Sequence, residues 1–198
     1  MSEPRLIEMQ RPRDPHGQVL VLHGGASRPG SPAVSPTQLS VLRMVPIARR
    51  IARADKRLTV VRLLNSHRGW DPERTPLADV DWALDQLGDR LPTCLVGHSL
   101  GGRAALLAGD RDGVRGVVAL NPWVYPYDDA DLSGRRVLIV HGTEDRVAPI
   151  ERARAVARNL ARRTEVDFQE VPGGKHAMLR HGREFERAAA RFVAKTLP

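Results

Sequence analysis

The chain has 198 residues, of which 27% are charged, and a formal net charge of +8 with a single cysteine, Cys94. A chain of this length fits one domain with a substantial core, no stretch approaches the roughly 20 apolar residues that a membrane-spanning helix needs, and residues 1–17 carry charges and prolines where a secretory signal has an apolar run. We therefore expect one cytoplasmic domain over residues 1–198 that binds no membrane, and the single cysteine excludes an internal disulfide and a cysteine-based zinc site.

The positive charge makes nucleic acid a partner to consider, because clustered Lys and Arg are the footprint of phosphate binding. Only three of the 31 basic residues are lysine, and the arginines are spread over every segment rather than gathered in one block. This distribution is typical of solvated helix faces, so we expect no nucleic-acid partner. The alternative, binding through the arginines, would appear as an affinity for duplex DNA that falls steeply with added salt.

Short apolar runs alternate with segments of helical periodicity along the chain, which is the pattern of parallel strands joined by crossover helices. Residues 1–17 form an N-terminal extension or an edge strand, with the strand over 5–10. Several further runs are apolar throughout, as in a sheet covered on both faces. These strands are expected over residues 18–24, 58–64, 93–99, 114–122, 136–142 and 166–172.

Amphipathic segments between the strands predict helices over residues 35–55, 76–90, 150–163 and 183–197. The first is expected to be kinked by Pro46. Its apolar face is expected at four helically spaced residues, Leu39, Leu42, Val45 and Ala48. The inner face of the last helix is expected at Phe185, Ala188, Ala189 and Val193.

Right-handed crossovers between these elements give a three-layer α/β/α sandwich around a mostly parallel sheet of about six or seven strands. In such a fold the loops at the carboxyl ends of the strands form the crevice for a ligand. Chemistry is therefore expected at those loops.

One of these loops carries the spacing G-x-S-x-G, from Gly97 to Gly101 around Ser99, where a predicted strand ends and a helix begins. That context is the one expected of a nucleophile elbow, a sharp strained turn that leaves no room for side chains two residues to either side of the serine. A packing corner of small residues is the alternative. Gly102, Ala104 and Ala105 are expected to let the following helix pack closely on the sheet.

A serine hydroxyl needs a general base, and the base works best when a carboxylate holds its ring in one tautomer. Asp145 follows the strand over 136–142, and His176 follows the last strand in a glycine-flanked loop. Asp145 could instead cap the following helix, with Glu144 taking its place. The competitors of His176 are His67, His141 and His181.

The oxyanion of acyl transfer needs preorganised N–H donors, one from the residue after the nucleophile and one from the loop after an early strand. Leu100 would supply the first donor and Gly25 the second, with Ala26 as the competitor of Gly25. The positive N-terminus of the helix after Ser99 would face the developing charge.

Four residues in loops beyond the strands are assigned to substrate binding, because binding groups collect there. They are Trp70, Trp123, Arg68 and His98. His98, beside the serine, is expected to pack and orient rather than act as a base. Tyr125 and Tyr127 share the loop of Trp123, and Arg68 and Arg103 could attract an anionic acyl or leaving group.

With the motifs VLVLHGG, GHSLGG, VHGTEDRVAP and GGKHAML, the chain resembles small lidless α/β-hydrolase-fold serine hydrolases of the dienelactone-hydrolase-like or actinobacterial esterase type. The resemblance implies a triad of Ser99, Asp145 and His176 and hydrolysis of an ester or related acyl bond. Two departures limit it. The N-terminus is too short for the full hairpin that opens such sheets, and the segment between ALNPW and RRVLIV is too short for a helical lid.

The sequence therefore predicts a carboxylesterase or thioesterase for a small to medium acyl substrate, acting as a monomer or homodimer. No metal or organic cofactor is expected. Acyl transfer or peptide cleavage by the same triad is one alternative. A non-catalytic binding protein is another, because the fold alone does not guarantee activity.

Overall fold

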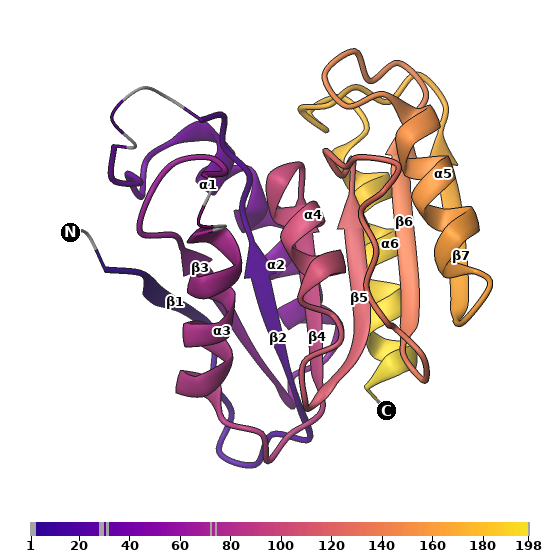
Figure 1. Cartoon of the computed structure of the whole chain (residues 1–198). Coiled ribbons are helices and arrows are strands. Elements are labelled where there is room, and N and C mark those ends of the chain that lie inside the picture. The colour runs from indigo at the N-terminus through magenta and orange to yellow at the C-terminus, as the bar shows by residue number, and fades with distance from the viewer. Residues whose placement is uncertain (1–2, 28–29, 31, 72, 74, 198) are drawn as a thin grey trace.

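A seven-stranded sheet forms the centre of the protein, as the computed structural model shows for residues 3–27, 30, 32–71, 73 and 75–197 (Figure 1). The strands follow the order β1-β3-β2-β4-β5-β6-β7, and all neighbours are parallel except β1 and β3. Their bounds are β1 Arg5–Gln10, β2 Gly17–Leu22, β3 Leu58–Leu64, β4 Thr93–His98, β5 Val114–Leu120, β6 Arg136–Gly142 and β7 Glu165–Val171. The predicted edge strand over 5–10 is present, and residues 1 and 2 of the expected extension lie outside the described residues.

Helices cover both faces of the sheet, which confirms the three-layer sandwich. Figure 1 shows α2 and α6 on one face and α3, α4 and α5 on the other, and each face has its own large apolar cluster. The helix bounds are α1 Leu39–Leu42, α2 Met44–Ala54, α3 Thr75–Leu87, α4 Leu100–Leu107, α5 Ile150–Leu160 and α6 Gly182–Thr196. Because both faces are covered, β2 and β4 are buried at every position.

The helix predicted over residues 35–55 is instead two helices, α1 and α2, with Arg43 between them. Pro46 is the third residue of α2 and lacks the N–H that would donate to the carbonyl of Leu42, so the hydrogen-bond ladder is interrupted there. The helix is therefore interrupted at Arg43 and not merely kinked at Pro46.

The apolar face predicted for this segment is also partly wrong. Leu39 and Leu42 are 75% and 45% exposed. The buried face lies one position away, where the larger side chains recur at the same helical spacing and contact the sheet. It consists of Val41, Met44, Ile47, Ala48 and Ile51.

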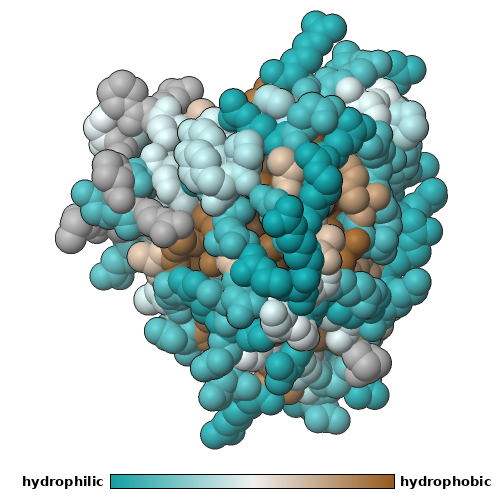
Figure 2. All heavy atoms as spheres, turned by 45° about the vertical axis from the view of Figure 1, so that its right-hand side comes forward, coloured by the Kyte–Doolittle hydropathy of each residue, from teal (hydrophilic) through white to brown (hydrophobic). Residues whose placement is uncertain are grey.

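The inner face predicted for the last helix is confirmed in α6. Phe185, Ala188, Ala189 and Val193 are each no more than 5% exposed. Hydrophilic side chains cover most of the face drawn in Figure 2, with apolar atoms visible in patches between them. In the part of the chain that the structure describes, no helix is long and apolar enough to cross a bilayer.

Candidate active site

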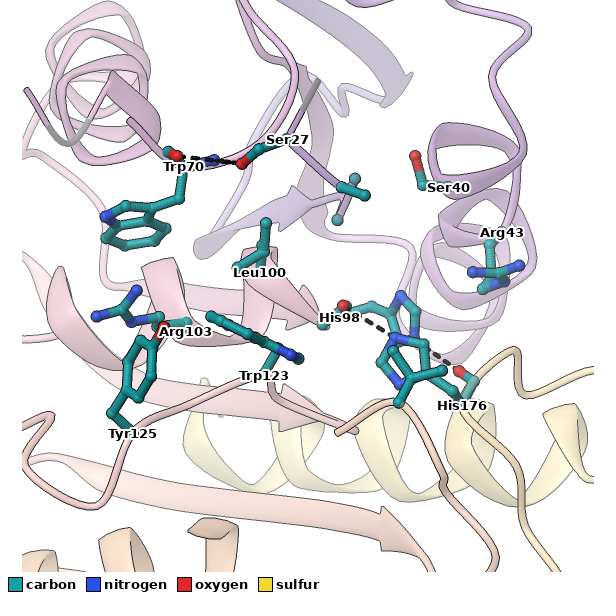
Figure 3. A pocket seen from close by; sticks show the side chains of 15 residues that line it. Ser27, Ser40, Arg43, Trp70, His98, Leu100, Arg103, Trp123, Tyr125 and His176 are labelled. Carbon is teal, nitrogen blue, oxygen red and sulfur yellow. Dashed lines mark hydrogen bonds between the residues drawn. The ribbon is translucent and has the colours of Figure 1, made fainter. Parts of the chain in front are cut away.

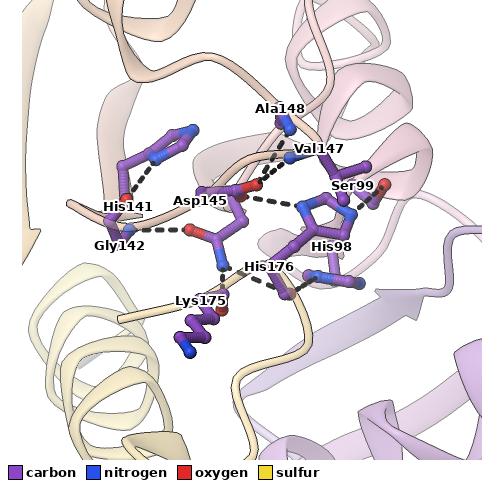
Figure 4. A network of polar contacts seen from close by, with 10 residues as sticks. His98, Ser99, His141, Gly142, Asp145, Val147, Ala148, Lys175 and His176 are labelled. Atoms are coloured by element: carbon purple, nitrogen blue, oxygen red, sulfur yellow. Dashed lines mark hydrogen bonds and ion pairs between the residues drawn. The ribbon is translucent and has the colours of Figure 1, made fainter. Parts of the chain in front are cut away.

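Three side chains from distant parts of the sequence meet beyond the carboxyl ends of β4, β6 and β7 (Figure 4). Nε2 of His176 lies 2.9 Å from Oγ of Ser99, and Nδ1 of His176 lies 2.8 Å from Oδ2 of Asp145. These are hydrogen-bond distances. Through these two hydrogen bonds the imidazole of His176 can accept the hydroxyl proton of Ser99, while the carboxylate of Asp145 holds the ring in one tautomer.

The turn that presents Ser99 is strained. Its φ of 57° and ψ of −120° lie in a region that residues with side chains rarely adopt. A Cβ at Gly97 would lie 2.0 Å from the carbonyl oxygen of Gly101, and a Cβ at Gly101 would lie 2.5 Å from that of His23. The two flanking glycines are therefore required by backbone contact, as the G-x-S-x-G spacing predicts.

Asp145 is held as a hydrogen-bond acceptor by three donors. Its Oδ1 accepts the N–H groups of Val147 and Ala148 at 2.8 and 2.9 Å, and its Oδ2 faces His176. The side chain has no exposed surface. Burial alone would raise the pKa of Asp145, but the hydrogen bonds from His176, Ala148 and Val147 outweigh it and leave the pKa below its ordinary value. The carboxylate is therefore ionised at neutral pH.

The alternative roles considered for this position are resolved by the contacts. The residue that caps α5 is Pro149, and Asp145 instead caps the turn before the helix while it contacts His176. Glu144 is exposed. One carboxylate thus both shapes the turn and orients the imidazole.

The other candidate histidines have different partners. His67 contacts the hydroxyl of Ser66, His141 is fully buried with Nδ1 near the carbonyl of Gly142, and His181 is the N-cap residue of α6. Among the residues described, the imidazole hydrogen-bonded to the elbow serine is that of His176.

His98 lies beneath His176 rather than beside the serine hydroxyl. Its Nε2–H donates to the carbonyl oxygen of His176 at 2.8 Å, and the two ring centroids are 4.9 Å apart. Burial, together with the nearby charge of His176, lowers the pKa of His98 to about 3. A ring that stays neutral in this position can hold the loop of His176 in place.

Asn121 is a second support of this loop, which sequence reasoning missed. The side chain is fully buried, and its Nδ2 donates to the carbonyl oxygens of Lys175 and His176 at 3.1 and 3.3 Å. Its Oδ1 accepts the N–H of Gly142 at 2.8 Å. The sequence shows only an amide directly after the apolar strand β5, a place where Asn tolerates the φ of 42° found here, and it does not reveal the distant carbonyl partners of that amide.

A pocket of about 580 Å³ opens over Ser99 (Figure 3). The loop after β2 forms one wall, and it lies so close that a Cβ at Gly24 would be 2.9 Å from the Cβ of Ser99. Gly25, Ala26 and Leu100 all line the pocket. The three residues considered as oxyanion donors therefore line the pocket, and the choice between Gly25 and Ala26 stays open.

One end of the pocket is aromatic. Trp70, Trp123 and Tyr125 line it together with Arg103 (Figure 3). The guanidinium of Arg103 lies 4.2 Å from the ring centroid of Trp70 and 4.9 Å from that of Tyr125. Its Nε and Nη2 each contact one oxygen of Asp128 at 2.8 Å. Arg103 is thus a neutralised part of the wall, which corrects the expectation that it attracts an anionic substrate group.

The opposite end of the pocket is cationic. Figure 3 shows Arg43 and Ser40 on the same side as His98 and His176, away from the aromatic end. Nε of Arg43 is buried and has no hydrogen-bond partner among the described residues. Burial lowers the pKa of this guanidinium. Sequence patterns could not single out Arg43, because nothing local distinguishes it from the other arginines of the segment.

Two aromatic or cationic residues expected near the substrate lie outside this pocket. Arg68 lines a neighbouring, more open depression, with its N–H on the carbonyl of Pro32. Tyr127 is 75% exposed and stacks on Tyr125 with an interplanar angle of 6°. Trp70, Trp123 and His98 are the three assigned residues that do line the pocket.

Residues 121–135, between β5 and β6, contain no helix, so the expected absence of a helical lid at this place is confirmed. Within the described ranges, no group of three or more His, Cys, Asp or Glu side chains is arranged to hold a metal ion.

Comparison with known proteins gives one family and many similar folds. The profile of the Alpha/beta hydrolase family matches residues 80–184, just over half of the chain. No curated protein matches. Est1E from Butyrivibrio proteoclasticus has a TM-score of 0.72 at 16% identity, covering 98% of this chain and 93% of its own.

Two further solved structures are similar over almost the full length of both chains. Dienelactone hydrolase from Anabaena variabilis has a TM-score of 0.71 at 18% identity, with 100% of this chain and 99% of that chain covered. Monoacylglycerol lipase from Paleococcus ferrophilus has a TM-score of 0.71 at 18% identity, with 98% and 99% covered. At such identities the likeness demonstrates the fold.

Proposed function

Because the chain belongs to the alpha/beta hydrolase family and is a hydrolase, we propose that it cleaves a carboxylic ester or thioester of a small to medium acyl group through Ser99, His176 and Asp145. The observation that carries the proposal is the continuous series of hydrogen bonds from the strained serine through the imidazole to the buried carboxylate. Three such groups at the ends of three strands form the arrangement that acyl transfer requires.

In the first half of the reaction, Oγ of Ser99 attacks the substrate carbonyl and Nε2 of His176 takes the hydroxyl proton. The tetrahedral intermediate then collapses, the bond to the leaving group breaks, and His176 returns the proton to the leaving oxygen or sulfur. In the second half, His176 takes a proton from water while the water oxygen adds to the acyl carbon. The bond between that carbon and Oγ of Ser99 then breaks, the carboxylic acid leaves, and His176 returns the proton to Oγ. Asp145 stabilises the imidazolium in both halves.

The negative charge on the carbonyl oxygen would be met by the N–H of Leu100, at the N-terminus of α4, and by the N–H of Gly25. Preorganised donors of this kind commonly lower the barrier to acyl transfer more than any other single group of contacts. The close approach of Gly24 to Ser99 supports this role, because the loop that carries Gly25 lies against the elbow.

Two of the similar structures are named as a monoacylglycerol lipase and a dienelactone hydrolase. These names describe the cleavage of carboxylic esters, and they favour an ester over an amide as the bond cleaved by this chain. The open pocket without a helical lid favours a small substrate in solution.

Labelling with a fluorophosphonate tests the proposal directly, because only an activated serine displaces fluoride from the phosphorus. We expect wild type and Ser27→Ala, which removes another hydroxyl of the same pocket, to be labelled, and Ser99→Ala to remain unlabelled with an unchanged circular dichroism spectrum. Labelling of Ser99→Ala, or no labelling of folded wild type, would refute serine catalysis and favour a binding protein.

A further inference from the structure

We propose that Arg43 binds a carboxylate on the leaving group of the substrate, while the acyl group occupies the aromatic end of the pocket. This inference rests on the ester hydrolysis proposed above. It assigns a chemical class to each half of the substrate.

The first argument is the free charge of Arg43. Two arginines line the pocket, and Arg103 is neutralised by Asp128 through two 2.8 Å hydrogen bonds. The side chain of Arg43 has no ion pair and no hydrogen bond among the described residues, and its Nε is buried. The described lining residues include no Asp or Glu. A half-buried cation without a counter-charge is unfavourable, and a carboxylate on a ligand would relieve that cost.

The second argument is that the unsatisfied polar atoms of the pocket gather at one end. The buried side-chain atoms without a partner on its lining residues are Nε of Arg43 and Nδ1 of His98. The charge of Arg43 contributes to the lowered pKa of His98, so the two side chains are close. Buried polar groups are normally hydrogen-bonded, and a polar substrate group at this end would supply the partner.

The third argument concerns direction. The leaving oxygen must receive its proton from Nε2 of His176, so the leaving group has to lie on the His176 side of Ser99. Arg43 lies on that side, whereas Trp70 and Tyr125 lie on the other (Figure 3). An anion bound by Arg43 is therefore carried by the leaving group, and the flat apolar end accepts the acyl group.

Pairs of esters that differ only in the charge of the leaving group test the role of Arg43. O-benzoylglycolate carries a carboxylate on its leaving group, and O-benzoylglycolamide is a neutral compound of almost the same shape. Homologues with one and two additional methylenes in the leaving group test different distances between the reacting ester and the guanidinium of Arg43. The acyl group is benzoyl throughout, and kcat/KM is measured from the release of benzoate.

We expect wild type to prefer the carboxylate ester at its best chain length, and Arg43→Gln to lower kcat/KM for that ester by about 10- to 100-fold, the range of a charged hydrogen bond. The loss should be smaller for the carboxamide ester, because a neutral amide gains less from a cationic donor than a carboxylate does. Arg43→Lys should retain part of the preference, because it keeps the charge without the planar fork. Arg49→Gln removes one charge from an exposed position of α2 and should leave the preference intact.

The experiments distinguish failure of the Arg43 carboxylate site from failure of the proposed ester hydrolysis. Equal cleavage of both esters, or an equal loss of both in Arg43→Gln, overturns the role of Arg43 while Ser99-dependent hydrolysis stands. An Arg43-dependent preference for monobenzyl succinate over its amide overturns the direction, because there the carboxylate is on the acyl side. If wild type cleaves none of these esters, calorimetric binding of O-benzoylglycolate to Ser99→Ala decides. Binding weakened tenfold or more by Arg43→Gln supports the carboxylate site, and unchanged or absent binding overturns it.

Discussion

Replacing Asp128 with alanine should destabilise the protein strongly, because this carboxylate is the only described counter-charge of a buried arginine. Arg103 and Asp128 are 10% and 5% exposed at their side chains and share two 2.8 Å hydrogen bonds. Oδ2 of Asp128 also accepts the N–H of Tyr125 at 2.8 Å. The substitution thus leaves the guanidinium of Arg103 without a counter-charge between the rings of Trp70 and Tyr125. It also removes the acceptor of the Tyr125 N–H.

The expected magnitude follows from these contacts. Removing one partner of a buried ion pair costs about 3–5 kcal/mol, and the loss of the hydrogen bond from the Tyr125 N–H adds about 1 kcal/mol. The free energy of unfolding should therefore fall by roughly 4–6 kcal/mol, a large part of the total stability of an ordinary domain. For a chain of this size the Tm should fall by roughly 8–24 °C.

Urea unfolding at pH 7, followed by circular dichroism, measures this loss. Asp129→Ala is the matched control, because Asp129 pairs with Arg163 at the surface, where both side chains are more than 40% exposed, and it should cost less than about 1 kcal/mol. The double variant Arg103→Met with Asp128→Leu should be more stable than Asp128→Ala, since it leaves no unpaired charge.

The reasoning is refuted if Asp128→Ala costs no more than Asp129→Ala, or if the double variant is no more stable than Asp128→Ala. Either result would mean that the pair does not hold the aromatic wall. In the expected case, the residual folded Asp128→Ala should also show a raised KM for benzoyl esters.

Gly24→Ala should lower kcat by roughly 10- to 100-fold with an unchanged circular dichroism spectrum, because its Cβ would lie 2.9 Å from that of the elbow serine; an unaffected kcat would contradict this. His98→Asn should lower kcat/KM by loosening the loop of His176 but leave the midpoint of the acidic limb of the pH profile in place, since His98, with its pKa of about 3, is already neutral; a moved midpoint would show that His98 titrates. The pKa of Asp145 is depressed in the folded state, so its stabilisation is present above the ordinary value of about 3.9 and lost as the pH falls through the lower folded value. The difference in free energy of unfolding between wild type and Asp145→Asn should shrink below about pH 4, and a constant difference down to pH 2 would count against this. Burial raises the pKa of Cys94 to about 12, so a thiol reagent should react only as fast as the protein unfolds, and rapid labelling of native protein would be inconsistent with it.

The inner strands could be predicted from the sequence because each is a short, mainly apolar run that both faces of the sheet bury, whereas the edge strands β1 and β7 mix apolar and polar residues and are only partly buried. β1, β3 and β6 have the predicted bounds, and β7 differs by one residue. The elbow was equally visible, since its G-x-S-x-G spacing is contiguous in the sequence. Gly97 is required by a contact within the turn, although Gly101 is required by the carbonyl of His23 after the distant strand β2. Features that depend on the order of neighbouring residues can therefore be predicted from the sequence.

The missed features depend on residues that are distant in the sequence. The break at Arg43 follows from a missing hydrogen bond, but which face of α1 and α2 is buried follows from packing on the sheet. Arg103 and Arg43 look alike in sequence, and only the position of Asp128 makes one neutral and leaves the other free. Asn121 acts through the backbone of residues beyond β7, which no local pattern reveals.

The way His176 is held has a consequence for how this protein could diversify. Its carbonyl oxygen receives hydrogen bonds from His98, the last residue of β4, and from Asn121, the residue after β5, and both side chains are buried. The residues that follow it, Leu179 and Arg180, are exposed. An evolving lineage could therefore insert a cap at 179–180 and acquire a new substrate range while the geometry of its general base is inherited unchanged.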